Sequence, residues 1–314
     1  MAAAIEGMKE AFGRLAAGAA DVPLRSRVEV PRAGGTAIFM PAYLGGSEDL
    51  ALKVVSVFPG NPALGLPTIH AAVLVLAADT GRLLALLEGG TLTAIRTGAA
   101  SGAATDLLAR PDARTVAVIG SGVQARTQLE AVCTVRPIDT VWVYSPTAGH
   151  AAAFAAATAG QGPVPADVRV APDAGAAVAA ADIVCTATTA TTPVFDGRLL
   201  RPGTHVNGVG SFTPAMREVD LATIRRARVV VDQREAMAAE AGELIAALDA
   251  GVLDGAAIST LGEIINGTAP ARRSAEEITF FKSVGVAVQD LVAARIALAN
   301  ASAAGLGVIV PFAA

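Results

Sequence analysis

The spacing of apolar and polar residues changes character about one third of the way along the chain. Near the N-terminus, Ile5, Met8, Phe12 and Leu15 recur at helical spacing, and Gly18 can close that helix. Short apolar segments separated by turns follow, and they predict strands over residues 24–30, 36–40, 50–58, 70–77 and 83–87. Consecutive strands joined by short turns favour an antiparallel or mixed sheet.

A long helix is expected next, with Thr93 as its cap and Leu108 near its end. Ala94, Gly98 and Gly102 recur at every fourth position of this helix. Glycine inside a helix costs about 1 kcal/mol relative to alanine. The small face therefore indicates that another element approaches the helix closely.

From Thr115 onward, strand and helix patterns alternate. Strands are expected over residues 115–120, 140–145, 168–171, 182–187, 205–209 and 228–231. Such alternation predicts a parallel, doubly wound α/β sheet. The last long helix, over about residues 284–303, precedes no further strand, so we expect it to cross back onto the first sheet.

The segment TVAVIGSGVQA carries a candidate nucleotide-binding turn. An apolar strand breaks at Gly120, and Gly122 and Ala125 complete the G-x-G-x-x-G/A spacing before a helix. The glycines permit a tight turn and a close backbone approach to a pyrophosphate, and the helix N-terminus supplies unpaired donors. Because both flanking elements agree with the motif, the sequence predicts a dinucleotide site here.

The next strand ends without the acid that NAD sites usually place there for the ribose hydroxyls. Ser145, Thr147 and His150 follow it, and Arg126 lies on the preceding helix. These residues specify neither NAD nor NADP. The missing acid slightly favours NADP, because it removes one barrier to a 2′-phosphate.

Four cations in the first part of the chain are candidates for a binding site. Lys53 lies inside an apolar strand, where an unpaired ammonium is costly. Arg25 and Arg27 share one strand face, and Arg96 lies early in the long helix, where a guanidinium suits bidentate capture of a carboxylate. A solvated edge strand for Lys53 and a structural salt bridge for Arg96 are the competing interpretations.

Two further segments are candidates for the carboxyl edge of the parallel sheet, where ligands bind in such folds. The turn over residues 208–212 follows the strand that begins at His205, itself expected to be a core histidine. Thr186 ends the preceding strand. Lys282 and Ser283 are expected just before the last helix, with Ser283 as a helix cap.

Composition excludes several classes of function. The 314 residues carry a net charge of −4 and contain no basic block, which argues against nucleic acid as a partner. Cys133 and Cys185 lie in apolar runs and are expected to be reduced thiols of a cytoplasmic protein. The three histidines are scattered, so no metal site is visible. The uncharged C-terminal stretch is interrupted by Gly and Pro, so a packed helix and tail are expected, not a membrane span.

Taken together, the segments resemble the ornithine cyclodeaminase/mu-crystallin family. The matching stretches, in family order, are PLR, FMPAY, KVVSVFPGNPALGLPTIH, LTAIRTGAAS, GSGVQA, NGVGSF and FKSVGVAVQD. The resemblance implies a Rossmann dinucleotide-binding domain, residues 111–284. It also implies a discontinuous α+β substrate-binding and dimerisation domain, residues 1–110 and 285–314, in a homodimer.

By the same resemblance, the enzyme would move a hydride between NAD(P) and the α-carbon of an imino or amino acid. Arg25, Lys53 and Arg96 would hold the substrate carboxylate, and Lys53 or water would handle the proton. The residues implied or expected at the cofactor are Thr68, Arg96, Gly120, Gly122, Val123, Gln124, Ala125, Ser145, Thr147, Thr186, Val209, Gly210, Ser211, Phe212 and Ser283.

Two positions depart from the cyclodeaminase pattern. Cyclodeaminases proper carry acids where this chain has Ile38 and Phe212. The chain therefore looks closer to ketimine reductases and archaeal-type alanine dehydrogenases. An ornithine or lysine cyclodeaminase with catalytic NAD is the first alternative, and a non-enzymatic nucleotide-dependent binding protein is the second.

Overall fold

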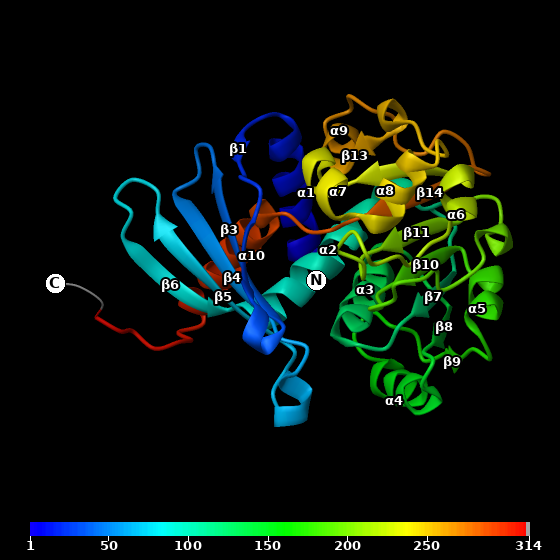
Figure 1. The fold of residues 1–314 in the computed structure, drawn as a ribbon, viewed down its shortest axis with the longest axis horizontal. Helices are drawn as coiled ribbons and strands as arrows, with labels where there is room; N and C mark the ends of the chain where they lie inside the picture. Colours follow the sequence, from blue (N-terminus) through cyan, green and yellow to red (C-terminus); the bar gives the residue numbers. More distant parts are fainter. Residues whose placement is uncertain (312–314) are drawn as a thin grey trace.

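The computed structural model describes residues 1–311 and contains two sheets with helices between and around them (Figure 1). The first sheet is antiparallel, as expected, with the order β1-β3-β4-β5-β6 and β2 also paired to β3. Its strands are β1 (Ala20–Asp21), β2 (Ser26–Val30), β3 (Gly35–Leu44), β4 (Asp49–Val57), β5 (Ile69–Ala77) and β6 (Leu83–Glu88).

The second sheet has eight strands in the order β13-β12-β14-β11-β10-β7-β8-β9, and every pair in it is parallel. The predicted doubly wound α/β sheet is therefore confirmed. Its strands are β7 (Thr115–Ile119), β8 (Thr140–Tyr144), β9 (Val168–Val170), β10 (Ile183–Thr186), β11 (His205–Gly208), β12 (Ala227–Val231), β13 (Ser259–Thr260) and β14 (Ile278–Lys282).

Strand β14 corrects the expectation that Lys282 simply precedes a helix. It lies between β11 and β12, and all five of its residues are buried. A strand buried on both faces shows no alternation of apolar and polar residues, and such a short apolar run cannot be distinguished from a helix segment by periodicity. The two-residue strands β1 and β13 are also absent from the sequence-based prediction.

The helices are α1 (Ala2–Ala16), α2 (Gly89–Leu108), α3 (Val123–Val135), α4 (Ala148–Thr158), α5 (Ala174–Ala180), α6 (Leu221–Arg226), α7 (Arg234–Glu240), α8 (Gly242–Asp249), α9 (Leu261–Ile265) and α10 (Ala287–Ala303). Short 3₁₀ helices are η1 (Pro31–Ala33), η2 (Asn61–Leu64), η3 (Gly197–Leu199) and η4 (Gly255–Ala257). Long helices α1, α2 and α10 lie between the two sheets (Figure 1).

Helix α2 begins one turn before the predicted cap. The side chain of Glu88 accepts hydrogen bonds from the backbone N–H groups of Gly90 and Thr91, so Glu88 is the cap and the prediction of Thr93 was wrong. The small face is confirmed as a contact surface. A Cβ on Gly98 would lie 2.4 Å from the Thr127 carbonyl oxygen, because α3 crosses α2 there.

Helix α10 returns to the first sheet, as expected, and packs on β3, β4 and β5 and against α1. In Figure 1 it lies against the antiparallel sheet, far in sequence from its strands. The helix starts at Ala287, three residues later than predicted. The domain limits near residues 110 and 284 stay a prediction.

Cys133 and Cys185 are both free and buried, and burial raises the pKa of each thiol to about 12. Within residues 1–311, no helix combines the length and apolar character needed to cross a membrane. The same residues contain no group of His, Cys, Asp or Glu side chains that could hold a metal ion.

Candidate functional site

The last residues of five neighbouring strands of the parallel sheet, β8, β7, β10, β11 and β14, are aligned with one another across the sheet. Register pairs join Tyr144 to Ile119, Ile119 to Thr186, Thr186 to Gly208, and Gly208 to Lys282. The structure thus brings six of the fifteen predicted cofactor residues to one edge of the sheet, at or just after these strand ends. They are Gly120, Gly122, Ser145, Thr186, Val209 and Ser283.

The glycine turn after β7 has the geometry that a dinucleotide site needs. Gly120 has a φ of +116°, and a Cβ there would lie 2.5 Å from the Ala187 carbonyl oxygen, so the position requires glycine. A Cβ on Gly122 would meet no described atom within 4 Å, so the backbone there is open to a ligand.

Helix α3 begins directly after this turn, and within the described chain no side chain caps its N-terminus. Val123 is exposed and Ala125 is buried, and the side-chain oxygen of Gln124 is buried with no partner among residues 1–311. Free backbone donors at a helix start and an unpaired buried oxygen fit a bound dinucleotide phosphate and its neighbouring groups.

At the end of β8, Ser145 is buried, whereas Thr147 and His150 are exposed. Thr68 lies in the loop between β4 and β5. Its carbonyl oxygen accepts from the Phe58 amide in the same loop, and no hydrogen bond of the described residues joins it to the edge of the parallel sheet.

Lys53 is buried in the first sheet, with 2% of its surface exposed. Its Nζ lies 3.0 Å from both carboxylate oxygens of Asp290 on α10. Arg96 on α2 reaches the same carboxylate, with 3.1 Å between its Nε and Oδ1, and also donates to Gln289. A solvated edge position for Lys53 is therefore excluded, and Arg96 does form the salt bridge that was the competing interpretation.

Arg25 joins the same cluster from the residue before β2. Its guanidinium pairs with Glu240 on α7 and donates to the carbonyl oxygens of Val284 and Gly285, at 3.2 and 3.4 Å. A Cβ on Gly285 would lie 2.6 Å from a terminal nitrogen of Arg96. The structure thus brings Arg25, Lys53 and Arg96 together around the segment that follows β14, one strand from the turn after β11.

Arg27 is half-buried, with its Nη2 2.9 Å from Oε1 of Glu240. Glu240 therefore lies between two arginines. Each of the two carboxylates therefore pairs with two cations: Glu240 with Arg25 and Arg27, and Asp290 with Lys53 and Arg96.

The electrostatics of the cluster act most strongly on Lys53. Burial lowers the pKa of its ammonium from 10.5 to about 8, with a further lowering by Arg96 and an opposing effect of Asp290. An amine with a pKa near neutrality can both hold and release a proton under ordinary conditions. The side chain is therefore suited to proton transfer.

Asp232, after β12, fixes the segment between β14 and α10. Its Oδ2 accepts from the Ser283 hydroxyl at 2.9 Å and from the backbone N–H groups of Val284 and Gly285. Ser283 is therefore not a helix cap, which corrects the sequence-based expectation. The carboxylate of Asp232 takes the hydroxyl, and α10 starts four residues further on, with Val286 at its cap position.

The turn after β11 is also tightly held. Lys282 donates to the Ser211 carbonyl oxygen at 2.6 Å, and the Ser211 hydroxyl donates to Glu243 at 2.7 Å. Phe212 is half-buried. His205 is a satisfied core histidine, as expected: its ring lies between Thr279 and Asn207, and burial lowers its pKa to about 3.

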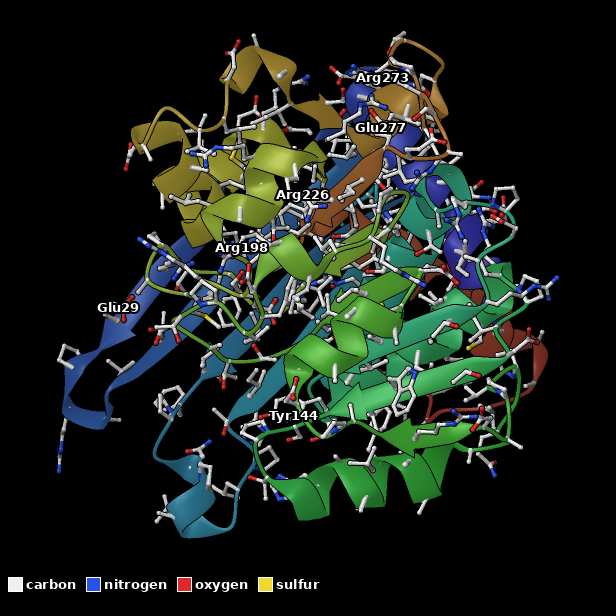
Figure 2. The ribbon with its side chains drawn as sticks, turned by 90° about the vertical axis from the view of Figure 1, so that its right-hand side faces the viewer. Glu29, Tyr144, Arg198, Arg226, Arg273 and Glu277 are labelled. Atoms are coloured by element: carbon white, nitrogen blue, oxygen red, sulfur yellow. The ribbon has the colours of Figure 1, made fainter. Side chains whose placement is uncertain are left out.

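The sequence-based prediction missed five acids that organise this region, namely Asp232, Asp290, Glu218, Glu240 and Glu243. One signal was present: a lysine in an apolar strand requires a carboxylate, and Asp290 is an acid on a mostly apolar helix. A hollow of about 520 Å³ lies outside this region. It lies at the amino ends of β12 and β14, beside Arg226, Arg273 and Glu277, which Figure 2 shows well away from Tyr144 at the end of β8.

Comparison with known proteins places the chain among nucleotide-dependent enzymes. It is 42% identical over 292 residues to a Δ1-pyrroline-2-carboxylate reductase of Bacillus cereus, with 92% of this chain and 89% of that protein covered. The structure of Thermococcus litoralis Δ1-pyrroline-2-carboxylate reductase with NADH and L-proline is similar, with a TM-score of 0.93, 42% identity, and coverage of 98% and 95%.

An archaeal alanine dehydrogenase dimer with bound NAD has a TM-score of 0.91 and 34% identity, and covers 99% of this chain and 94% of its own. These similarities confirm the predicted class, an NAD(P)-dependent oxidoreductase of imino or amino acids. The ornithine cyclodeaminase/mu-crystallin profile matches residues 1–305. The chain therefore belongs to the ornithine cyclodeaminase/mu-crystallin family.

Proposed function

We propose that the protein reduces Δ1-pyrroline-2-carboxylate, or a closely related cyclic imino acid, to the corresponding amino acid with a hydride from a reduced nicotinamide cofactor. The observation that carries the proposal is the convergence of Arg25, Lys53 and Arg96 beside the carboxyl edge of the parallel sheet. The solved reductase of similar sequence, with NADH and L-proline bound, supports the same substrate class.

The charges of the cluster suit a substrate with one carboxylate. Four cations, Arg25, Arg27, Lys53 and Arg96, share two buried carboxylates, Asp290 and Glu240, so the cluster keeps an excess of positive charge for an anion. A substrate carboxylate held by these cations would have its α-carbon directed at the nicotinamide.

The cofactor, when bound, supplies the hydride. We assign its phosphates to the Gly120–Gly122 turn and the start of α3 with Val123, Gln124 and Ala125, and its ribose to Ser145 and Thr147. We assign the nicotinamide end of the cofactor to residues beside Arg96, namely Thr186, Ser283 and the turn of Val209, Gly210, Ser211 and Phe212. Thr68 is the weakest assignment, because of its position in the first sheet's loop.

Lys53 is proposed to provide the proton. Reduction of a C=N bond adds a hydride at carbon and a proton at nitrogen, so a donor is required near the imine. The Lys53 ammonium, with its pKa near 8, can give up a proton at neutral pH, and Asp290 fixes the position of its Nζ.

The cyclodeaminase alternative is weaker. Ile38 is buried in β3 and Phe212 lies in the turn after β11, so apolar side chains stand where cyclodeaminases carry acids. The solved relatives hold NADH and NAD, which supports NAD(H). The missing acid after β8 keeps NADP in the proposal as the alternative cofactor.

We also propose that two copies pair through the outer face of the first sheet. Leu86 on β6 is 68% exposed, and Leu84, two residues before it on the same strand, is also exposed. The solved archaeal relative is a dimer. Sedimentation of the purified protein tests this, since a monomer at all concentrations contradicts it.

The proposed activity is tested by offering the purified protein NADH or NADPH with pyrroline-2-carboxylate, piperideine-2-carboxylate, or pyruvate with ammonia. Loss of reduced-cofactor absorbance with a cyclic imino acid is the expected result. Proline formed from ornithine with only catalytic NAD would establish the cyclodeaminase instead. No turnover of any substrate, with cofactor still bound, would favour the binding protein.

A further inference from the structure

Glu218 is a fully buried carboxylate between β11 and α6 that the proposed chemistry does not use. Its Oε1 accepts from the Thr188 amide at 2.7 Å and from the Thr188 hydroxyl at 2.8 Å. Its Oε2 accepts from the Thr186 hydroxyl at 3.0 Å and from the amides of Gly210 and Ser211 at 2.7 and 3.3 Å. The Glu218 side chain thus holds two segments together: the end of β10 with Thr188, and the turn after β11 with Gly210 and Ser211.

Those two segments follow neighbouring strands, β10 and β11, and both lie at the edge assigned to the cofactor. Their backbones come very close together, since a Cβ on Gly210 would lie 2.2 Å from the Thr188 carbonyl oxygen. The turn at Gly120 in turn contacts Ala187. The Gly120 turn, the segment after β10 and the turn after β11 therefore form one continuous backbone surface, which we call the backbone wall. Glu218 holds together the part of this wall that is formed by the segment after β10 and the turn after β11.

The same turn is held from its other side by a buried ion pair. Lys282 lies 3.0 Å from Glu243, neither has exposed side-chain surface, and both bond to Ser211. Burial raises the pKa of Glu218, while Lys282 opposes that effect. Buried ionic groups are poor contributors to stability compared with well-packed apolar side chains. Their concentration under one turn therefore indicates a role in fixing its geometry.

We propose that Glu218 is a positioning residue that fixes the wall against which the nicotinamide end of the cofactor binds. The inference rests on the proposed function, because it assumes a nicotinamide at this edge. Glu218 itself contacts neither cofactor nor substrate. It acts through the amides of Thr188 and Gly210, whose relative position sets where the ring can lie.

The substitution Glu218→Gln separates the hydrogen-bonding role of the side chain from the space that it fills. The amide keeps the size of the carboxylate but has only one oxygen that accepts. The hydroxyls of Thr186 and Thr188 can rotate to suit an NH₂ group, whereas the backbone N–H groups of Thr188 and Gly210 cannot. One of the two segments therefore loses its acceptor and is released from the other.

The test compares two ligands by calorimetric titration of the full-length protein. NADH carries the nicotinamide, and ADP-ribose lacks it but keeps the pyrophosphate. We expect Glu218→Gln to raise the Kd for NADH by about tenfold, in line with the loss of one buried hydrogen bond to a charged group. We expect the Kd for ADP-ribose to change less than about twofold, because the Gly120 turn keeps its own contacts.

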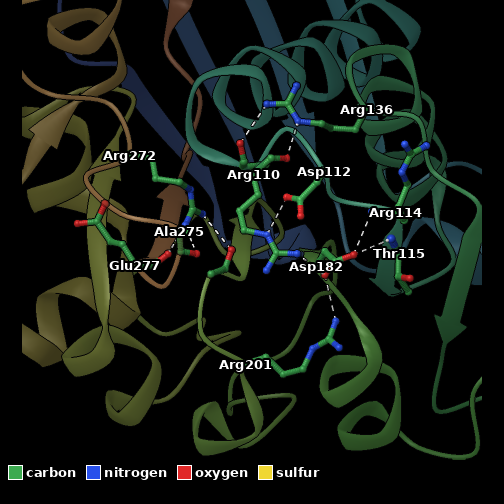
Figure 3. A network of polar contacts seen from close by, with 12 residues as sticks. Arg110, Asp112, Arg114, Thr115, Arg136, Asp182, Arg201, Arg272, Ala275 and Glu277 are labelled. Carbon is green, nitrogen blue, oxygen red and sulfur yellow. Dashed lines mark hydrogen bonds and ion pairs between the residues drawn. The ribbon is translucent and has the colours of Figure 1, made fainter.

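A matched control is Asp182→Asn at the opposite edge of the same sheet. Asp182 also accepts from two backbone amides, those of Arg114 and Thr115, and pairs with Arg110 and Arg201 (Figure 3). It should destabilise the fold without a selective effect on NADH. Thr188→Val removes a hydroxyl that donates to Glu218 and accepts from the Ala190 amide. This milder variant should weaken NADH binding by about twofold to threefold, in the same selective way.

The kinetic isotope effect on turnover provides a second measurement, one that does not change when part of the protein is unfolded. With NADH deuterated at the transferred position, the isotope effect on kcat should increase in Glu218→Gln, because a misplaced ring slows the chemical step. The proposed role of Glu218 would be overturned if Glu218→Gln weakened the binding of NADH and of ADP-ribose equally. It would also be overturned if NADH binding were unchanged in both Glu218→Gln and Thr188→Val. Absence of NADH binding by the unaltered protein would instead overturn the proposed function, and this inference with it.

Discussion

The Nζ of Lys53 lies 3.0 Å from each carboxylate oxygen of Asp290, and the pair joins the first sheet to the helix that returns from the end of the chain. Asp290 has 1% of its surface exposed. The pair is thus shielded from water, and its third partner, Arg96, comes from α2. Three elements that are distant in sequence meet at one carboxylate beside the carboxyl edge of the parallel sheet.

Replacement of Lys53 by Met should remove both a carboxylate contact and the proposed proton donor. We expect kcat/KM for the imino acid to fall by at least about 100-fold, the lower end of the contribution of general acid catalysis. NADH binding, measured by calorimetry, should stay close to that of the unaltered protein. Lys9→Met is the matched control, since Lys9 also pairs with an aspartate, Asp106, but in a partly exposed position. Near-normal turnover of Lys53→Met would disprove the assignment.

Arg96→Leu should act mainly on substrate binding. A charge-assisted hydrogen bond is worth roughly 1.5–3 kcal/mol, so we expect kcat/KM to fall by about 10- to 100-fold or more, largely through a higher KM. Asp290 and Gln289 would also lose a partner, so the thermal midpoint should be measured in parallel. Unchanged kinetics in a well-folded variant would remove Arg96 from the site.

The lowered pKa of Lys53 has two consequences for pH dependence. In the reductive direction, kcat should decline as the pH rises through about 8, because the proton donor is lost. For stability, the unfolded state binds more protons than the folded state between about 8 and 10.5, so the contribution of Lys53 to stability rises with pH across that window. Urea unfolding of the unaltered protein and of Lys53→Met, compared at both ends of the window, measures this; a difference that falls with pH contradicts it.

Asp290→Asn tests the pair from the other side. Asp290 raises the pKa of Lys53 against the effects of burial and Arg96. Without its charge, that pKa should fall further, and the alkaline decline of kcat should move to lower pH. The pH profile of kcat provides the measurement. A profile that keeps its position, with only a lower plateau, would show that Asp290 does not set the protonation of Lys53.

The sequence predicted much of this fold for identifiable reasons. Alternating strands separated by turns indicated the antiparallel sheet, and the alternation of strand and helix indicated the parallel one. Strand β14 escaped because its buried residues show no period. Thr93 was a plausible helix cap on local grounds, but Glu88 lies at the true start and takes the amides.

The sequence predicted the cations of the candidate site but not the acids that pair with them. Lys53 and Arg96 stood out because cations among apolar neighbours need a reason, whereas Arg25 was selected by the resemblance to the family. Their partners did not, since Asp290 is 237 residues from Lys53 and Glu240 is 215 from Arg25. Such pairings arise from tertiary packing and leave no local pattern. The assignment of these residues to substrate and cofactor stays a prediction.

The central claim is that three cations of the first part of the chain hold a carboxylate beneath a nicotinamide at the edge of the parallel sheet. A crystal structure of the protein with NADH and L-proline tests it most directly. The account predicts the proline carboxylate within hydrogen-bond distance of Arg25, Lys53 and Arg96, with its α-carbon facing C4 of the nicotinamide. A carboxylate bound elsewhere, or a nicotinamide distant from the turn after β11, would contradict it.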